Sequence, residues 1–191
     1  MQYVVRQYSD EYNDYRGYDA RVAGGIFKKG DEVMLLPSGF TTRISKIETY
    51  DGELEEAFPP MSVTMHIADD FDVSRGDMIV RVNNMPRQEQ DIDLMICWFN
   101  DKPLQERGKY IIRHTTKEAR CIIREVRYRM DVNTLHRDTS SHQIGMNDIA
   151  RISIRTTMPL FVDPYQRNRS TGSVILIDEG TNETVAAGMV I

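Results

Sequence analysis

Apolar and polar residues alternate along much of the chain with a period of two residues. Residues 63–67 place valine, methionine and isoleucine between threonine and histidine, and residues 150–155 place alanine and isoleucine between arginine and serine. Successive side chains of a β-strand point to opposite faces, so both segments predict strands with one buried face. Glycine-containing turn signals such as Lys29-Gly30-Asp31 separate the expected strands. Many short strands predict an all-β fold of barrels or sandwiches, with helix limited to one short turn at residues 141–147.

The segment at residues 119–130 carries the same alternation with one interruption. Its first half places apolar residues at positions 119, 121 and 123, and its second half at positions 126, 128 and 130. The two halves share one face only if an extra residue is inserted near Arg124 and Glu125. A β-bulge supplies one extra residue, and bulges let long strands bend around a barrel. We predict a bulge there, with two separate strands as the alternative.

Two runs are apolar throughout, residues 94–99 and residues 174–177. Such runs are expected in strands that are buried on both faces or that lie at a domain interface. Residues 94–99, which include Trp98, are therefore a candidate interface strand. An ordinary place in a barrel core is the interpretation we favour for that run.

A polar joint interrupts the strand pattern near the middle of the chain. Pro86 ends a strand, residues 87–91 are wholly polar, and a new apolar run begins at Ile92. The joint predicts two domains, residues 1–86 and residues 87–191, each of a size suited to a small barrel.

The composition is that of an ordinary soluble globular protein, with 40% hydrophobic and 28% charged residues among 191. A net charge of -5 argues against a dominant nucleic-acid surface, although a local basic patch at Arg151, Arg167 and Arg169 stays compatible with it. No apolar run approaches the roughly 20 residues of a membrane span, and no secretory signal opens the chain. Cys97 and Cys121 lie in apolar stretches and are expected to be small buried hydrophobes, so we expect a cytoplasmic protein.

The motifs of nucleotide binding are absent. A P-loop needs Gly-x-x-x-x-Gly-Lys-Ser/Thr to wrap phosphates with backbone amides, and no such segment exists. Lys28-Lys29-Gly30 has the reverse order, and Asp14-Tyr15-Arg16-Gly17 matches a switch-loop pattern only by chance. Asn100-Asp101-Lys102 does not give the guanine-recognition signature. We therefore expect no GTP binding of the usual kind.

No catalytic, cofactor-binding or metal-binding residue is assigned. The four histidines are not paired at metal-ligand spacing, although His136 and His142 could converge across a loop. No Gly-x-Ser-x-Gly elbow exposes a serine nucleophile. Arg75-Gly76-Asp77 is interpreted as a turn between strands, and the acidic residues 51–56 as a solvated loop or a contact for a basic partner.

Several segments resemble domains two and three of the large subunit of bacterial sulfate adenylyltransferase, a relative of elongation factor Tu. In the first half these are residues 2–6, 14–18, 30–33, 36–39, 51–58 and 72–78. In the second half they are residues 131–135, 147–150, 163–165, 168–169, 171–173, 175–178, 181–182 and 187–189. The Leu-Pro-Ser-Gly and Asp-Gly-Glu-Leu-Glu-Glu-Ala-Phe loops are the specific ones in the first half. Local departures occur at residues 6–8 and at Pro59-Pro60.

The resemblance implies two consecutive translation-factor-type β-barrels, similar to domains II and III of elongation factor Tu. It also implies that the complete subunit is a GTPase that pairs with a small catalytic subunit. Together they make adenosine 5′-phosphosulfate and pyrophosphate from ATP and sulfate, and GTP hydrolysis drives the reaction. GTP and magnesium are expected in a GTPase domain upstream of this chain, and some relatives carry a fused adenylylsulfate kinase. The chain alone is expected to be inactive.

Our leading hypothesis is thus a non-catalytic module that contacts its own upstream GTPase domain and the small catalytic subunit, with no membrane or nucleic acid as partner. The alternative is an elongation factor fragment that binds aminoacyl-tRNA, which predicts a basic groove and salt-sensitive RNA binding. The acidic balance of the chain argues against that alternative. An independent enzyme is a third hypothesis, and it lacks candidate residues.

Overall fold

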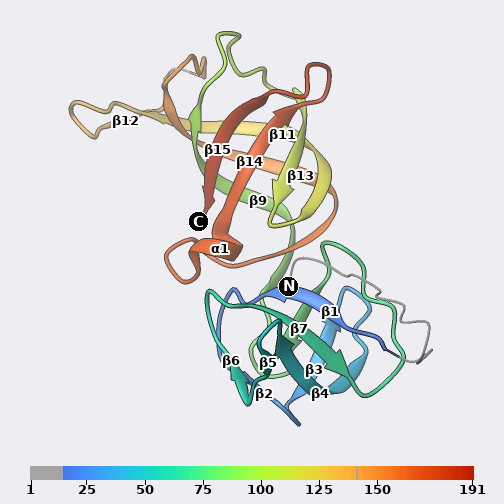
Figure 1. The fold of residues 1–191 in the computed structure, drawn as a ribbon. Helices are drawn as coiled ribbons and strands as arrows, with labels where there is room; N and C mark the ends of the chain where they lie inside the picture. Colours follow the sequence, from blue (N-terminus) through green and yellow to red (C-terminus); the bar gives the residue numbers. More distant parts are fainter. Residues whose placement is uncertain (1–14, 141) are drawn as a thin grey trace. The chain divides into compact units, whose positions relative to one another are not determined.

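The computed structural model describes residues 15–140 and 142–191 (Figure 1). Within this part, the regular structure consists of β-strands and one four-residue helix, α1 (Arg169–Gly172), which confirms the predicted all-β class. The chain divides into two compact units, Met1–Met85 and Pro86–Ile191. None of the described helical structure is long and apolar enough to cross a membrane.

Parts of some predictions lie outside the described residues. These are the family segment at residues 2–6, the first residue of the segment 14–18, the departure at residues 6–8, and the first residue of the helical turn at 141–147. Residues 142–147 contain no helix, so the remainder of that last prediction is wrong.

The first unit is built on a six-stranded antiparallel sheet. The strands of this unit are β1 (Tyr18–Arg21), β2 (Phe27–Lys28), β3 (Glu32–Leu36), β4 (Thr41–Thr49), β5 (Gly52–Glu53), β6 (Glu56–Ala57), β7 (Ser62–Ile67) and β8 (Met78–Arg81). The sheet has the order β1-β7-β4-β3-β8, with β5 beside β4, and β2 pairs separately with β6. Val63 and Met65 are buried and Ile67 is partly buried, which confirms the alternation predicted for this strand.

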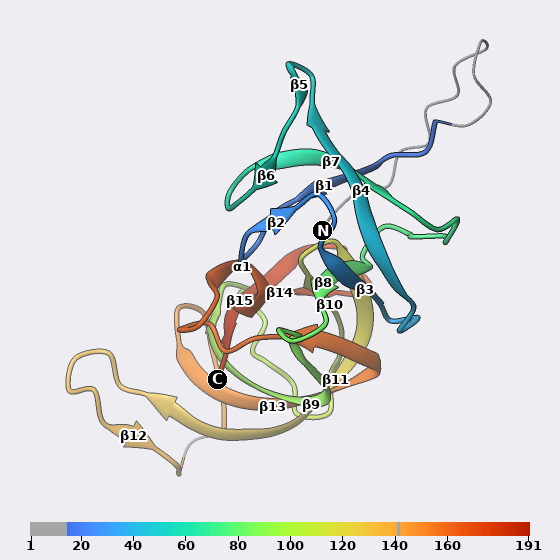
Figure 2. The same ribbon diagram turned by 90° about the horizontal axis from the view of Figure 1, so that it is seen from below.

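The second unit contains a closed barrel. Its strands are β9 (Arg87–Trp98), β10 (Lys109–His114), β11 (Lys117–Met130), β12 (Arg137–Asp138), β13 (Ile149–Val162), β14 (Ser173–Asp178) and β15 (Thr184–Val190). The order β10-β14-β15-β9-β13-β11 is closed by a ladder between β10 and β11. Figures 1 and 2 show these strands wrapping around a common interior, with β12 extending away from it.

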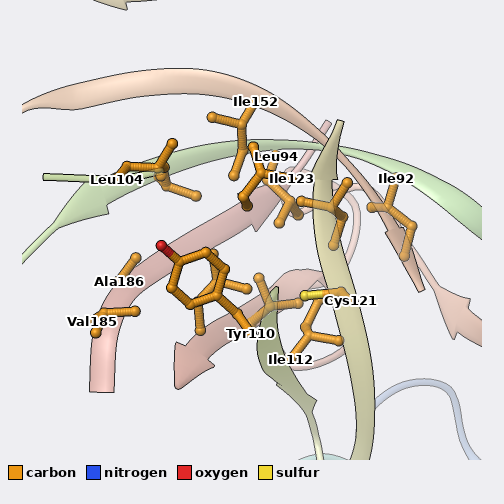
Figure 3. Close-up of a cluster of buried hydrophobic side chains, with 14 of the residues drawn as sticks. Ile92, Leu94, Leu104, Tyr110, Ile112, Cys121, Ile123, Ile152, Val185 and Ala186 are labelled. Carbon is orange, nitrogen blue, oxygen red and sulfur yellow. The ribbon is translucent and has the colours of Figure 1, made fainter. Parts of the chain in front are cut away.

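The barrel interior is filled with apolar side chains (Figure 3). Ile92 and Leu94 of β9 and Ile112 of β10 have no exposed surface. Trp98 packs edge-on against Tyr110, with ring centroids 5.7 Å apart, and its Nε1 donates to the carbonyl of Lys102 at 2.9 Å. Burial of one such side chain stabilises a fold by about 1.5–3 kcal/mol, so the interior accounts for the stability of this unit.

The predicted β-bulge is present. β11 is one continuous strand, and its register against β13 shifts between Ile123 and Glu125 and again between Val126 and Tyr128. Arg124 and Glu125 are both exposed, so the extra residue lies at the predicted place. The alternative of two separate strands is wrong.

Two other expectations differ from the structure. The two compact units meet between Met85 and Pro86, and the polar segment at residues 87–91 is the first part of β9, where residues 87–89 pair with residues 160–162 of β13. The run at residues 94–99 is not buried on both faces, because Met95 and Cys97 are half-buried and Phe99 is exposed.

Trp98 is a core residue rather than part of an interface strand, as we favoured. Cys121 is buried as predicted, and both cysteines are free thiols.

Helix α1 depends on a side-chain cap that the sequence pattern did not reveal. The Asn168 side chain accepts hydrogen bonds from the amides of Ser170 and Thr171 at 3.0 and 3.4 Å. Such a cap satisfies amides that lack a partner in the first turn. Gly172, which ends the helix, lies against the backbone of Tyr165.

Gly172→Ala should destabilise the second unit by about 1–3 kcal/mol. An added Cβ would lie 2.4 Å from the Tyr165 Cα and 2.9 Å from the Asp163 carbonyl oxygen, and backbone atoms cannot easily move away. Urea unfolding followed by tryptophan fluorescence measures the change. Gly145→Ala is the control, because its Cβ would meet only Asp148 at 3.7 Å; an equal loss in both variants would contradict the close approach.

Candidate functional site

The described residues contain no group of three or more histidine, cysteine, aspartate or glutamate side chains that could hold a metal ion. His142 lies 3.0 Å from the Val126 carbonyl and 3.7 Å from Glu106, and it forms no pair with His136 in this part of the chain. The convergence of these two histidines across a loop is therefore not observed.

The most concentrated polar cluster of the first unit surrounds Glu48, near the end of β4. The Glu48 carboxylate accepts a hydrogen bond from the Tyr15 hydroxyl. Lys46 Nζ lies 2.6 Å from it and His66 Nε2 lies 2.7 Å from it. Only 17% of the Glu48 side chain is exposed. Alternation places these side chains on the outer face of the sheet, since Ile47 and Met65 point into the core.

The electrostatics of this cluster fix its protonation state. The hydrogen bond from Lys46, followed by that from Tyr15, lowers the pKa of Glu48 to about 2. Burial, followed by the hydrogen bond to Glu48, raises the pKa of Tyr15 to about 12. An effective general base has a pKa near the working pH, so an anion as weakly basic as Glu48 is unsuited to proton abstraction. The bond between Glu48 and His66 joins β4 to β7.

A groove of about 490 Å³ lies on the same unit, between β1, β7 and the end of β4. Its polar lining residues are Asp19, Arg21, Thr49, Tyr50, Ser62 and Thr64. Thr64 Oγ1 donates to Asp19 at 2.6 Å. The nearby His66 ring is bonded to Glu48. Asp19 is therefore the group that the Thr64 hydroxyl contacts, and this pair joins β1 to β7.

The family segments at residues 163–165 and 171–173 of the second unit make packing contacts. His114 is 1% exposed, and its Nε2 lies 2.7 Å from the Thr171 carbonyl. Thr171 Oγ1 donates to Asp163 at 2.8 Å, which ties α1 to the end of β13. Burial lowers the pKa of His114, so the ring is neutral and donates to that carbonyl. These contacts explain the motif without a reaction.

Other motifs form turns. The Asp131 carboxylate accepts from the amides of Asn133 and Thr134 at 2.8 and 3.2 Å. Asp178 accepts from the amides of Gly180 and Thr181 at 2.8 and 2.9 Å. Aspartates in such positions close turns by accepting amides of the following residues.

The Arg75-Gly76-Asp77 tripeptide is a turn, as interpreted from the sequence. Gly76 has a φ of 92°, a conformation that favours glycine, and the Ser74 amide donates to Asp77 Oδ2 at 2.9 Å. The acidic residues 51–56 are partly neutralised within the chain, because Glu53 pairs with Lys46 at 3.4 Å and Glu56 pairs with Lys28 at 3.2 Å.

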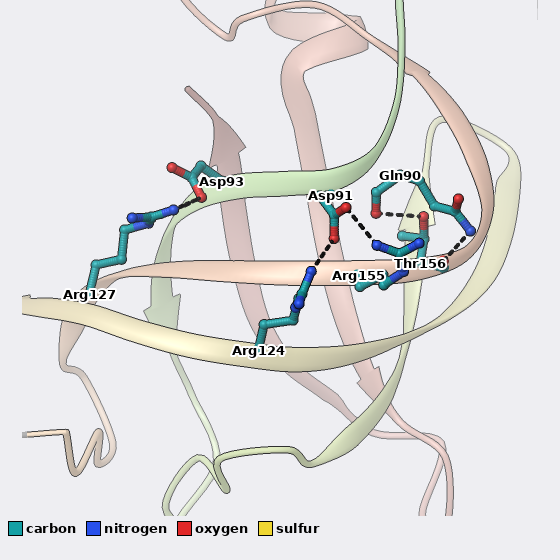
Figure 4. Close-up of polar contacts among 7 residues, drawn as sticks. All are labelled: Gln90, Asp91, Asp93, Arg124, Arg127, Arg155 and Thr156. Carbon is teal, nitrogen blue, oxygen red and sulfur yellow. Dashed lines mark hydrogen bonds and ion pairs between the residues drawn. The ribbon is translucent and has the colours of Figure 1, made fainter.

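The three arginines suggested as a basic patch have separate partners. Arg151 pairs with Asp93 at 2.8 Å, Arg167 with Asp163 at 3.9 Å, and Arg169 lies over the Tyr165 ring. The structure instead places Arg151 beside Asp93, next to three other arginines that pair with Asp91 and Asp93 and are drawn in Figure 4. In the sequence, arginines occupy outward positions of the alternating segments at residues 119–130 and 150–155. Our prediction did not include a cluster formed by these arginines.

Replacing Glu48 should change the acid stability of the chain. A carboxylate with a lowered pKa contributes stability that is present above its ordinary pKa of 4.5 and is lost as the pH falls through about 2. As the pH falls from 5 to 2, the free energy of unfolding should therefore decrease in both proteins. The decrease should be about 1–2 kcal/mol smaller for Glu48→Gln than for the wild type, allowing for solvent screening. Urea unfolding across this range measures the difference.

Glu53→Gln is the matched control, because Glu53 also pairs with Lys46 but is mostly exposed. The free energy of unfolding of Glu53→Gln should fall with pH in the same way as that of the wild type. Parallel pH profiles for the wild type and Glu48→Gln would show that the cluster does not hold Glu48 ionised.

Comparison with known proteins places these features in a family. The model of the GTP-eEF1A C-terminal domain-like family matches residues 91–191. The bifunctional enzyme CysN/CysC of Mycobacterium tuberculosis (strain H37Rv) is 50% identical over 192 residues, which cover the whole chain and 31% of that protein. Sulfate adenylyltransferase subunit 1 of Bacteroides fragilis is 43% identical over 191 residues, covering the whole chain and 39% of that protein. The chain thus spans about a third of the length of these relatives.

The fold is found in translation factors. The crystal structure of Sup35 complexed with GDP matches the whole chain and 46% of its own chain, with a TM-score of 0.85 and 17% identity. At this identity the likeness shows the fold alone, and it confirms the translation-factor-type β-barrels. The resemblance to the large subunit of sulfate adenylyltransferase is confirmed by the curated relatives. With its residues 91–191 matched by the family model, the chain belongs to the GTP-eEF1A C-terminal domain-like family.

Proposed function

We propose that this chain is the two-barrel C-terminal region of sulfate adenylyltransferase subunit 1. The complete protein would couple GTP hydrolysis to the synthesis of adenosine 5′-phosphosulfate from ATP and sulfate. The observation that carries the proposal is 43–50% identity, over the whole chain, to proteins named for this activity. The family segments in the loops at residues 36–39 and 51–58 support the sulfate-activating branch.

The role within that enzyme would be coupling rather than chemistry. GTP and magnesium would be held by the upstream GTPase domain, and sulfate adenylylation would belong to the small catalytic subunit. The barrels would contact both and transmit the nucleotide state through surfaces that differ between two states. The absence of a P-loop from the sequence and the lowered pKa of Glu48, which makes it a weak base, support an accessory role.

The same proposal places the protein in the cytoplasm and leaves this chain alone without enzymatic activity. Its two free thiols, Cys97 and Cys121, suit a reducing compartment. The Cys121 thiol is not activated, since burial raises its pKa to about 12.

A domain exchange tests the proposal. The matched third of the M. tuberculosis enzyme is replaced by this chain, and pyrophosphate release from ATP and sulfate is measured with and without GTP. Because the two segments are 50% identical, we expect GTP-stimulated synthesis to be retained within about tenfold.

The matched control carries the corresponding barrels of Sup35, which share the fold but only 17% of the sequence. That exchange should abolish the stimulation by GTP. If both exchanges abolish it equally, the chain does not supply the coupling surfaces of this enzyme.

The alternative function is aminoacyl-tRNA binding by an elongation factor fragment, which the shared fold permits. The net charge of -5 opposes it. A gel-shift titration with charged tRNA separates the two, since micromolar, salt-sensitive binding would favour the alternative.

A further inference from the structure

Four arginines lie on the outer face of two neighbouring strands in the second unit. Arg124 and Arg127 come from β11, and Arg151 and Arg155 come from β13, which lies between β11 and β9. Their side chains are 30–52% exposed. We call these four residues the arginine face.

Two carboxylates of β9 bind all four guanidinium groups, and Figure 4 shows the contacts of Arg124, Arg127 and Arg155. Asp91 accepts from Arg124 at 3.0 Å and from Arg155 at 2.7 Å.

Asp93 lies 3.2 Å from Arg127 and 2.8 Å from Arg151. Burial alone would raise the pKa of Asp93, but the Arg151 hydrogen bond and the charges of both arginines outweigh burial and lower it. Asp93 is therefore ionised at neutral pH.

The charges of this cluster do not balance. Two aspartates face four arginines, so two positive charges are left over, and Glu125 at 3.8 Å from Arg127 removes at most one of them. An excess of positive charge therefore sits on a chain whose net charge is -5. A local field of the opposite sign steers partners to one face of a protein.

The arginine face is also preorganised. Each guanidinium has five N–H donors in a planar fork, and one aspartate engages only part of that fork. Since each aspartate already restrains its two arginines, little further rotamer freedom is lost on binding. The strands beneath belong to the closed barrel, which keeps the donors at fixed spacings.

We propose that the arginine face docks a carboxylate-rich segment of a partner protein. Carboxylates match the guanidinium fork in a bidentate manner. Asp91, Asp93 and Glu125 interrupt the positive charge and would repel a continuous phosphate backbone. The exposed Ile122, opposite Arg155, and the half-buried Met95, opposite Arg151, add apolar contact of the kind found in protein interfaces.

The test uses the 191-residue chain and a fluorescein-labelled peptide of alternating glutamate and leucine, followed by fluorescence anisotropy at low salt. Arg124→Gln with Arg155→Gln should weaken binding about fivefold to tenfold, because both cations beside Asp91 are lost. Asp91→Asn should strengthen binding severalfold, because it frees both arginines. Damage to the fold would weaken peptide binding in both variants. Weaker binding in one and stronger binding in the other therefore indicates an effect of charge.

Two controls accompany these variants. Arg113→Gln removes an arginine from an exposed ion pair with Glu118 on the β10 side of the barrel and should change binding less than twofold. Arg124→Lys with Arg155→Lys keeps the charge and should retain most of the binding, and thermal unfolding verifies that each variant is folded.

Three results would overturn the proposal. One is the absence of saturable peptide binding at low salt. Another is an equal loss in Arg113→Gln. The last is tighter binding of a single-stranded RNA of equal charge through the same arginines, which would identify a nucleic-acid surface instead. None of these outcomes depends on the sulfate adenylyltransferase assignment.

Discussion

The ladder between β10 and β11 is the constraint on which the second unit depends. By joining the two ends of the strand order, it closes the sheet and leaves no unpaired edge around the barrel. Each strand must then alternate between an inward side chain and an outward one. The inward positions, such as Ile112 of β10 and Cys121 of β11, are filled with apolar groups. Reactive chemistry has no place inside, so any role in recognition falls to the outer face.

Two polar side chains join β13 to β9 within this unit. Thr156 Oγ1 donates to the Met158 carbonyl at 2.7 Å, and Gln90 Nε2 donates to the Thr156 carbonyl at 2.9 Å (Figure 4). These bonds lie where the pairing of β13 with β9 is interrupted between Arg155 and Leu160. They keep β13 attached to β9 across this register shift. The His114 hydrogen bond to the Thr171 carbonyl fixes α1 in a similar way. Such structural bonds are consistent with the proposed coupling role, in which the nucleotide state is transmitted by contact.

The sequence predicted features that depend on local alternation and missed those that depend on pairing. The bulge at Arg124 and Glu125 was predictable because a phase slip is visible within one strand. The arginine face was not, because it requires the register that places Asp91 opposite Arg155, 64 positions along the chain. The strand character of residues 87–91 was missed for the same reason, since the charge of Asp91 is compensated by Arg124 and Arg155 of neighbouring strands. Helix α1 is only four residues long, too short for a periodic signal.

The central claim is that this chain forms a scaffold for contacts and handles no nucleotide phosphate itself. The most direct measurement is calorimetric titration of the purified chain with GTP and with ATP in the presence of magnesium, together with an assay of phosphate release. We predict no saturable heat for either nucleotide and no phosphate release above that of buffer. Saturable binding of GTP, or turnover by the chain alone, would contradict that claim.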